Sequence, residues 1–266
     1  MEPFVDALRR YDDIESRLTA PVSERMLDLA QLRAGQRVLD LASGCGEPAL
    51  RAASRVGAQG SVLGLDIAAE LIERAREKAQ RQALSNVEFR VANAELPEGL
   101  PGESFDAATA RWGLMGMRSP AAALAQVRRL LAPGAPFVAA LWAEPDRVPW
   151  AMLPRRVLRR YRDLPALDSD APGVFRYAEL SRIERDLAGA QFRLEHVEEM
   201  DVPVIETQTV DGILTWIRDL VLGRLAEGLS ERERAQYELD LAGEAEQLRV
   251  DGVFRLRGVT RIVLAR

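Results

Sequence analysis

The chain has 266 residues, of which 47% are hydrophobic and 29% are charged, and its formal net charge is −5. This length predicts one large α/β domain, with room for a helical subdomain. The acidic balance argues against binding to nucleic-acid phosphates, no apolar run is long enough to cross a membrane, and the single cysteine excludes an internal disulfide and a cysteine-cluster metal site.

The first half of the chain alternates segments of helical and strand character. Two helices are expected first, Pro3–Asp13 and Val22–Leu32. Five hydrophobic runs then predict strands at Arg37–Leu41, Ser61–Leu65, Val87–Val91, Phe105–Ala110 and Pro136–Trp142. Between these strands, the spacing of apolar residues predicts helices at Pro48–Val56, Ala69–Gln82 and Pro120–Leu131. This alternation predicts a parallel, doubly wound sheet with its ligand at the carboxyl ends of the strands.

After Trp142 the alternation stops, and a polar, proline-rich stretch runs from 143 to 173. Further helices are expected at about Pro149–Arg162, Tyr177–Leu187, Val210–Ala226 and Ser230–Leu248, and strands at Phe192–Val202 and Phe254–Ala265. Ser230 with Glu233 three residues later matches a helix capping box. The stretch 143–173 and the helices of 207–248 are candidate lid elements; alternatively, they complete the hydrophobic shell.

The strand at Arg37–Leu41 leads into a glycine-containing loop of the form D-x-x-x-G-x-G, from Asp40 to Gly46. A dinucleotide-binding loop would carry a third glycine where Ala49 stands, and Glu47 would repel a pyrophosphate at the start of the next helix. An acid at the end of the second strand, Asp66, suits the two hydroxyls of a ribose. A phosphate-free adenosyl ligand such as S-adenosylmethionine (SAM) fits this pattern, whereas an ordinary strand–glycine–helix turn is the simpler alternative.

With these residues the chain resembles the class I SAM-dependent methyltransferases, and within them the group related to the ubiquinone/menaquinone-biosynthesis C-methyltransferases. The matching segments are Val38–Pro48, Gly64–Asp66, Asn93–Pro97, Ser104–Ala107 and Leu130–Gly134; Arg111–Met115 and Leu141–Trp150 are similar to a bacterial branch that acts on small molecules. The resemblance implies a Rossmann-like sheet of seven strands with the last strand antiparallel. It divides the domain into residues 1–142, with the SAM-binding half of the sheet, and 143–266, with lid helices and C-terminal strands.

The resemblance also implies where SAM would bind. The candidate cofactor residues are Asp40, Ala42, Ser43, Gly44 and Gly46 beside the methionine part, Asp66 for the ribose, Ile67, Asn93, Ala94 and Glu95 around the adenine, Ala110 and Arg111 at the end of the fourth strand, and Tyr11 over the cofactor. Asn93 departs from the family, which usually carries Asp there, and a role as a turn residue is the alternative. Arg111 is expected to hold an acidic group or to pair with Asp106.

No catalytic base follows from the sequence. His196 is the single histidine and is expected to face solvent, so Tyr177 is the better pocket residue. Candidate substrate-pocket residues are Trp112, Met115, Trp142, Trp150 and Tyr177, which equally suit an ordinary core. No acid follows the fourth strand, so no divalent-metal site is expected.

The sequence therefore predicts a methyltransferase that uses SAM on a small organic molecule, at carbon, oxygen or nitrogen. Alternatives are a SAM-binding fold without methyl transfer, such as a cyclase or a binder, and an NAD-dependent oxidoreductase. The expected partner is a small-molecule acceptor, with neither nucleic acid nor membrane. Because Met1–Asp6 lacks the start of a signal peptide, we expect a cytoplasmic protein; the oligomeric state stays open.

Overall fold

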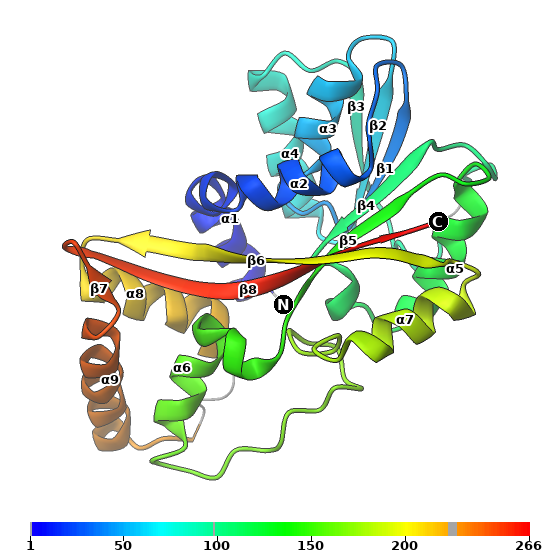
Figure 1. The fold of residues 1–266 in the computed structure, drawn as a ribbon. Coiled ribbons are helices and arrows are strands. Elements are labelled where there is room, and N and C mark those ends of the chain that lie inside the picture. Colours follow the sequence, from blue (N-terminus) through cyan, green and yellow to red (C-terminus); the bar gives the residue numbers. More distant parts are fainter. Residues whose placement is uncertain (1, 98, 223–227) are drawn as a thin grey trace.

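A computed structural model describes residues 2–97, 99–222 and 228–266 (Figure 1). The helices are α1 (Glu2–Leu18), α2 (Ala20–Leu29), α3 (Ala49–Val56), α4 (Ala69–Arg81), α5 (Pro120–Leu130), α6 (Pro149–Leu158), α7 (Leu180–Gly189), α8 (Val210–Ile217) and α9 (Glu231–Glu246), with short turns η1 (Leu114–Gly116), η2 (Pro145–Arg147) and the π-helical η3 (Arg218–Leu222). The strands are β1 (Arg37–Leu41), β2 (Ser61–Asp66), β3 (Val87–Val91), β4 (Ala107–Arg111), β5 (Phe137–Trp142), β6 (Leu194–Thr207), β7 (Arg249–Val250) and β8 (Val253–Ala265).

The strands form one sheet in the order β3-β2-β1-β4-β5-β8-β6, and the two-residue β7 pairs with β8 outside this path. β1 to β5 are parallel, and β8 runs antiparallel to both of its neighbours, β5 and β6. This confirms the predicted doubly wound sheet with an antiparallel last strand. The strand order reverses between β1 and β4, where such sheets hold their ligands.

The central strands are mostly apolar and buried because helices cover both faces of the sheet. β4 and β5 are buried almost throughout, and small residues such as Ala107 and Ala108 let the covering helices come close. α3 and α4 pack on the half of the sheet that contains β1, β2 and β3, whereas α5 and α7 pack together on the opposite side (Figure 1).

The second half of the chain follows the prediction less closely. β6 continues to Thr207, five residues beyond its expected end, although Pro203 lies within it. β6 is an edge strand, where a proline removes no ladder hydrogen bond, and the register shifts between Pro203 and Ile205. The helix expected at Tyr177–Leu187 begins only at Leu180.

The C-terminal helices form a group beside the long strands. α9 contacts both α6 and α8, α6 packs on β8, and α8 packs on β6 and β8 (Figure 1). The capping box at the start of α9 is confirmed, since Ser230 and Glu233 exchange both hydrogen bonds. The helix predicted at Val210–Ala226 is shorter: α8 ends at Ile217, η3 follows, and 223–226 lie outside the described residues. Among the described helices, none is long and apolar enough to cross a bilayer.

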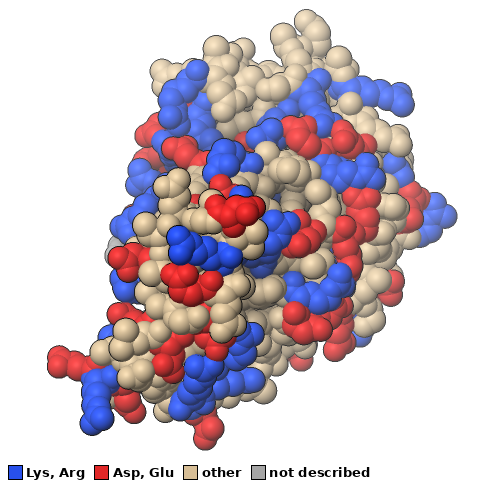
Figure 2. Space-filling model, turned by 60° about the vertical axis from the view of Figure 1, so that its left-hand side comes forward, with Lys and Arg blue, Asp and Glu red and all other residues tan. Residues whose placement is uncertain are grey.

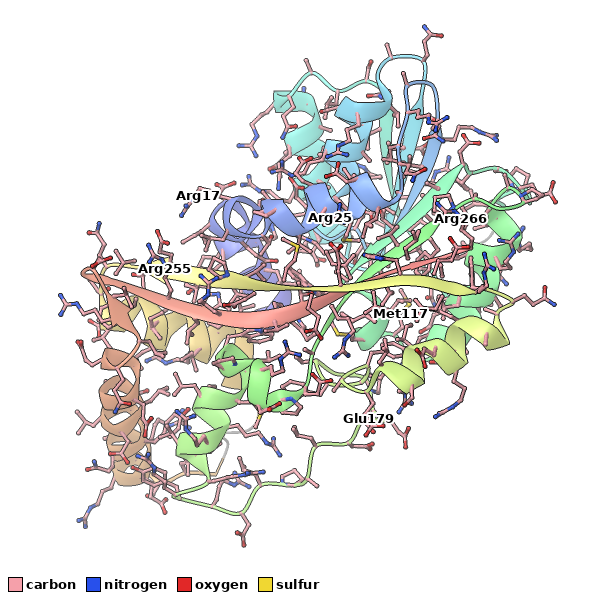
Figure 3. All side chains as sticks on the ribbon, in the orientation of Figure 1. Arg17, Arg25, Met117, Glu179, Arg255 and Arg266 are labelled. Carbon is pink, nitrogen blue, oxygen red and sulfur yellow. The ribbon has the colours of Figure 1, made fainter. Side chains whose placement is uncertain are left out.

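Charged side chains of both signs are intermixed on the face shown in Figure 2. Many of them form ion pairs that link elements far apart in the chain. Arg25 of α2 lies close to β6 (Figure 3), and its Nε and Nη2 donate to the two carboxylate oxygens of Glu198 at 2.6 and 2.7 Å. Arg147 bonds Glu199 of β6 in the same bidentate way. These charged pairs on the edge strand β6 disfavour its pairing with a strand of another molecule.

A buried ion cluster fixes α1 against α4. Lys78 Nζ donates to Asp12 Oδ1 at 2.8 Å, and Arg74 Nε donates to Asp12 Oδ2 at 3.0 Å. The side chains of Asp12 and Lys78 are only 3% and 8% exposed, so removing one charge leaves the other buried and uncompensated. The first helix is thereby held over the carboxyl end of the sheet.

We expect Asp12→Asn to lower the free energy of unfolding by about 2 kcal/mol, because the amide weakens two charge-assisted hydrogen bonds. Asp13→Asn is the matched control: Asp13 is the next residue and also pairs with Arg74, but its side chain is 82% exposed, so a change of less than about 0.5 kcal/mol is expected. Urea denaturation of both variants checks this, and equal effects would contradict it.

Candidate functional site

The loop after β1 takes a conformation that depends on its small residues. Ala42, Gly44 and Gly46 all have positive φ angles, of 51°, 51° and 104°. A Cβ on Gly46 would lie 2.9 Å from Leu50 Cδ1 and 3.2 Å from Ala75 Cβ, so only glycine fits between α3 and α4. The loop therefore presents bare backbone at the carboxyl end of β1.

Asp66 ties the end of β2 to this loop. Its Oδ2 accepts a hydrogen bond from Gly44 N at 2.9 Å, and its Oδ1 accepts one from Ala68 N at 2.9 Å. Burial raises the pKa of Asp66, and these two amides partly oppose the rise. The side chain is half-buried, and a carboxylate has about four acceptor positions, so two remain for a ligand.

Asp40 lies beneath the loop and does not reach the surface. Its side chain is fully buried, Oδ1 accepts from Thr109 Oγ1 at 2.6 Å, and Oδ2 has no hydrogen-bond partner among the described residues. Burial raises the pKa of Asp40 to about 7, against the Thr109 hydroxyl and the charge of Arg111. A cation above the loop would thus favour the ionised form from a distance, without direct contact.

The segment after β3 lies beside the end of β2. Asn93 is exposed, and its Oδ1 accepts from Glu95 N at 2.9 Å, which makes it a turn residue with one acceptor position left. Ala94 is buried, and Glu95 accepts from Ser119 N at 2.9 Å. Ile67 and Leu96 are 64% and 67% exposed, which is unusual for large apolar side chains so close to a polar loop. They offer apolar cover to a flat ligand.

The end of β4 packs directly against the loop after β1. Ala110 is buried, and Arg111 turns toward the first two helices, where Nη1 donates to Thr19 Oγ1 and to Ser23 Oγ. Of the two alternatives for Arg111, pairing with Asp106 is wrong, because Asp106 lies at the opposite end of β4, where its carboxylate accepts from Arg37 N at 2.7 Å. Thr19 and Ser23 carried no signal in the sequence, because their role depends on how α2 folds onto β4.

Gly113 allows this close contact, since a Cβ there would lie 2.4 Å from Ala42 Cβ. We expect Gly113→Ala to lower stability by about 2 kcal/mol and to displace the glycine loop, so that any adenosyl ligand binds more weakly. Gly116→Ala is the matched control, because a Cβ at Gly116 meets no atom within 4 Å. Thermal unfolding and ligand titration of both variants check this; similar results for the two would contradict it.

The four tryptophans form one cluster that runs from β4 to α8. Trp112 stacks on Trp142 at 4.6 Å, Trp150 meets Trp142 edge-on at 5.2 Å, and Trp216 meets Trp150 at 5.9 Å. Arg111 covers the other face of Trp112 at 4.9 Å, so both faces of that ring are occupied. Trp216 was not among the predicted pocket residues, because nothing in its local sequence points to the site.

The remaining predicted pocket residues belong to the packed interior. Met115 is 4% exposed, and its sulfur accepts from Trp142 N at 3.4 Å. Tyr177 is fully buried, its hydroxyl donates to Asp186 Oδ2 at 2.7 Å, and burial and Asp186 raise the pKa of Tyr177 far above its usual range. Tyr177 is therefore unsuited to act as a base.

Two other residues singled out in the sequence, Tyr11 and His196, form hydrogen bonds with acidic side chains of the protein. Tyr11 lies on α1, and its hydroxyl donates to Asp219 of η3 at 3.0 Å, which links the first helix to the helical group around α8. His196 is 43% exposed on β6 and bonds Glu198 at 2.9 Å, so it faces solvent as expected.

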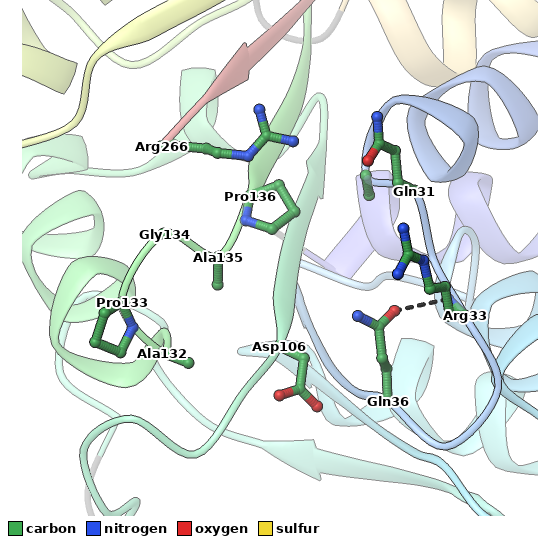
Figure 4. Close-up of a pocket in the computed structure, with 11 residues that line it drawn as sticks. Gln31, Arg33, Gln36, Asp106, Ala132, Pro133, Gly134, Ala135, Pro136 and Arg266 are labelled. Carbon is green, nitrogen blue, oxygen red and sulfur yellow. Dashed lines mark hydrogen bonds between the residues drawn. The ribbon is translucent and has the colours of Figure 1, made fainter.

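A shallow pocket of about 350 Å³ lies at the other end of the strands (Figure 4). Gln36, Asp106 and Pro136 line it, and these residues stand before β1, β4 and β5. It is thus at the amino-terminal edge of the sheet, away from Asp66 and the glycine loop. Groups of three or more metal-binding side chains are absent from the described part of the chain.

Comparison with known proteins agrees with this geometry. A family model described as a methyltransferase domain matches residues 32–153. Aklanonic acid methyltransferase DauC of Streptomyces sp. (strain C5) is 34% identical over 130 residues, which cover 49% of this chain and 59% of that protein. The ubiquinone/menaquinone biosynthesis C-methyltransferase UbiE of Erwinia tasmaniensis is 33% identical over 167 residues, covering 60% and 64%. The matches thus span about three fifths of these relatives.

Among solved structures, the BH2331 protein of Bacillus halodurans C-125 superposes with a TM-score of 0.62 at 18% identity, over 92% of this chain and 97% of that one. At this identity the likeness shows a shared fold alone. Residues 32–153 therefore match a methyltransferase domain, and the chain as a whole shares the fold of the solved structure and is similar to the two curated methyltransferases over part of their length.

Proposed function

We propose that the protein transfers the methyl group of SAM to a nucleophilic atom of a small organic molecule. The observation that carries this proposal is the Asp66 carboxylate, which is bonded to the amide of Gly44 and still has acceptor positions free. A carboxylate suited to ribose and a glycine loop thus meet at the point where the strand order of the sheet reverses.

The residues at this edge fit SAM. Asp66 would accept from the ribose hydroxyls, Ile67 would cover one face of the adenine, and the free acceptor position of Asn93 would take the adenine amine. The backbone of Ala42 to Gly46 would line the methionine part, next to Ala110. A pyrophosphate fits poorly, because Glu47 is held at the start of α3 by Arg51 at 2.8 Å.

Methyl transfer from SAM requires mainly that the protein bind the two substrates and orient them. Bound SAM would supply a methyl group already activated by its sulfonium charge. The protein would align the acceptor and exclude water, and the tryptophan cluster gives the site a rigid apolar wall for this purpose. Since neither His196 nor Tyr177 is placed to remove a proton, we propose an acceptor that has already lost its proton to water before it binds, such as the anion of an acidic phenol or of an acidic enol.

The relatives support an aromatic, quinone-like or polyketide-like acceptor, methylated at carbon, oxygen or nitrogen. Incubation with SAM labelled in its methyl group and a panel of hydroxyquinones and aromatic polyketides tests this. The expected result is a labelled product with an equal amount of S-adenosylhomocysteine. Rearrangement of an acceptor while SAM stays intact would instead support the alternative of a cyclase that binds SAM without methyl transfer.

A further inference from the structure

The Arg111 side chain is held in place by several contacts, yet not all of its N–H donors have a hydrogen-bond acceptor among the described residues. Its side chain is 9% exposed, the Trp112 ring covers one face of the guanidinium, and Nη1 bonds Thr19 and Ser23. Nη2 makes no hydrogen bond to any described residue. The carboxylate paired with it, Glu15 Oε1, is 3.9 Å away, too far for a hydrogen bond.

Glu15 lies on α1, with its carboxylate near Arg111. Its carboxylate has no hydrogen-bond partner among the described residues, and its side chain is 26% exposed. Burial nevertheless raises the pKa of Glu15, with the charge of Arg111 opposing the rise. Asp40, the other carboxylate that acts on Arg111, is fully buried. Glu15 is therefore the acid that a ligand can reach.

Glu15 and Arg111 lie near the glycine loop. Arg111 stands at the carboxyl end of β4, next to β1, and Glu15 is close enough to Cys45 in the loop for its charge to raise the pKa of that thiol, behind the larger effects of burial and Asp12. Asp12, one turn before Glu15, anchors α1 on α4. The backbone that would line the methionine part of SAM thus lies near both charged side chains.

We propose that Glu15 and Arg111 together bind the zwitterionic amino-acid end of the cofactor, with Glu15 accepting from its ammonium group and Arg111 Nη2 donating to its carboxylate. This inference rests on the proposed function and assigns to Glu15 a role that its sequence did not suggest. An ion pair opened to 3.9 Å suits a ligand that carries both charges on one carbon. A phosphate would be repelled by Glu15, and a simple amine by Arg111.

Calorimetric titration of Glu15→Gln with three ligands tests the proposal. S-adenosylhomocysteine has the whole amino-acid end, 5′-deoxy-5′-(3-aminopropylthio)adenosine keeps only the ammonium, and 5′-methylthioadenosine has neither charge. We expect the variant to lose about tenfold in affinity for the first two ligands and less than about twofold for the third. Asp13→Asn, on the exposed side of the same helix, is the control and should leave all three affinities unchanged.

The outcomes separate the possibilities. An equal loss for all three ligands would mean that Glu15 only supports the fold, and an unchanged affinity for S-adenosylhomocysteine would also overturn the proposal. If Glu15→Gln folds poorly, Glu15→Asp is the second variant. Because Glu15→Asp keeps the charge, it should bind the two ammonium-bearing ligands more tightly than a neutral variant of the same stability does. Failure of the unaltered protein to bind S-adenosylhomocysteine would instead refute the proposed function itself.

Discussion

Replacing Asp66 with alanine is expected to reduce the affinity for S-adenosylhomocysteine about 1,000-fold, which corresponds to about 4 kcal/mol. The carboxylate would accept two charge-assisted hydrogen bonds from the ribose, each worth roughly 1.5–3 kcal/mol. It also holds the Gly44 amide at 2.9 Å, so its loss loosens the loop. Isothermal titration calorimetry measures the change.

Glu88→Ala is the control for this experiment. Glu88 is an exposed carboxylate on the neighbouring strand β3, and among the residues that the structure describes it pairs with Arg90 of the same strand. Its removal should leave the affinity within about twofold, because surface ion pairs contribute little. If Asp66→Ala kept its affinity while Glu88→Ala behaved as expected, Asp66 could not be the ribose ligand.

The second large effect is expected in the pH dependence of stability. Burial raises the pKa of Asp40 to about 7, from the ordinary value of 3.8 that applies in the unfolded chain. The folded protein therefore holds this proton more tightly, and the stability that it contributes is present at low pH and is lost as the pH rises toward 7. Between pH 5 and pH 8 the Asp40 contribution should fall by about 3 kcal/mol.

Asp40→Asn removes this titration. Relative to the unaltered protein, the variant should become more stable by about 3 kcal/mol on going from pH 5 to pH 8, as measured by urea denaturation at each pH. Gly116→Ala, which removes no titratable side chain, is the control and should differ from the unaltered protein by the same amount at every pH. A constant difference between Asp40→Asn and the unaltered protein at all pH values would contradict a raised pKa for Asp40.

The sequence predicted best what is encoded locally. β1 and β3 have the predicted bounds, and β2 differs by one residue, because each is a short apolar run that ends at a polar loop. The loop with Gly44 and Gly46 follows the same logic, since its positive φ angles require small residues. These features place Asp66 beside the glycine loop without knowledge of the rest of the chain.

What the sequence could not predict depends on contacts between distant segments. Arg111 meets Thr19 and Ser23, about ninety residues earlier, only because α2 packs over the end of β4. Trp216 joins the tryptophan cluster through the packing of α8 on α6 and β8. Likewise, Pro203 indicated the end of a strand, whereas the edge position of β6 allows the strand to continue through it.

The central claim is that this site binds a phosphate-free adenosyl cofactor. Parallel calorimetric titrations of the unaltered protein with S-adenosylhomocysteine and with NAD test it most directly. We predict one site per chain for S-adenosylhomocysteine, with a dissociation constant on the order of micromolar, and no measurable heat with NAD. Tight binding of NAD with no binding of S-adenosylhomocysteine would contradict the account.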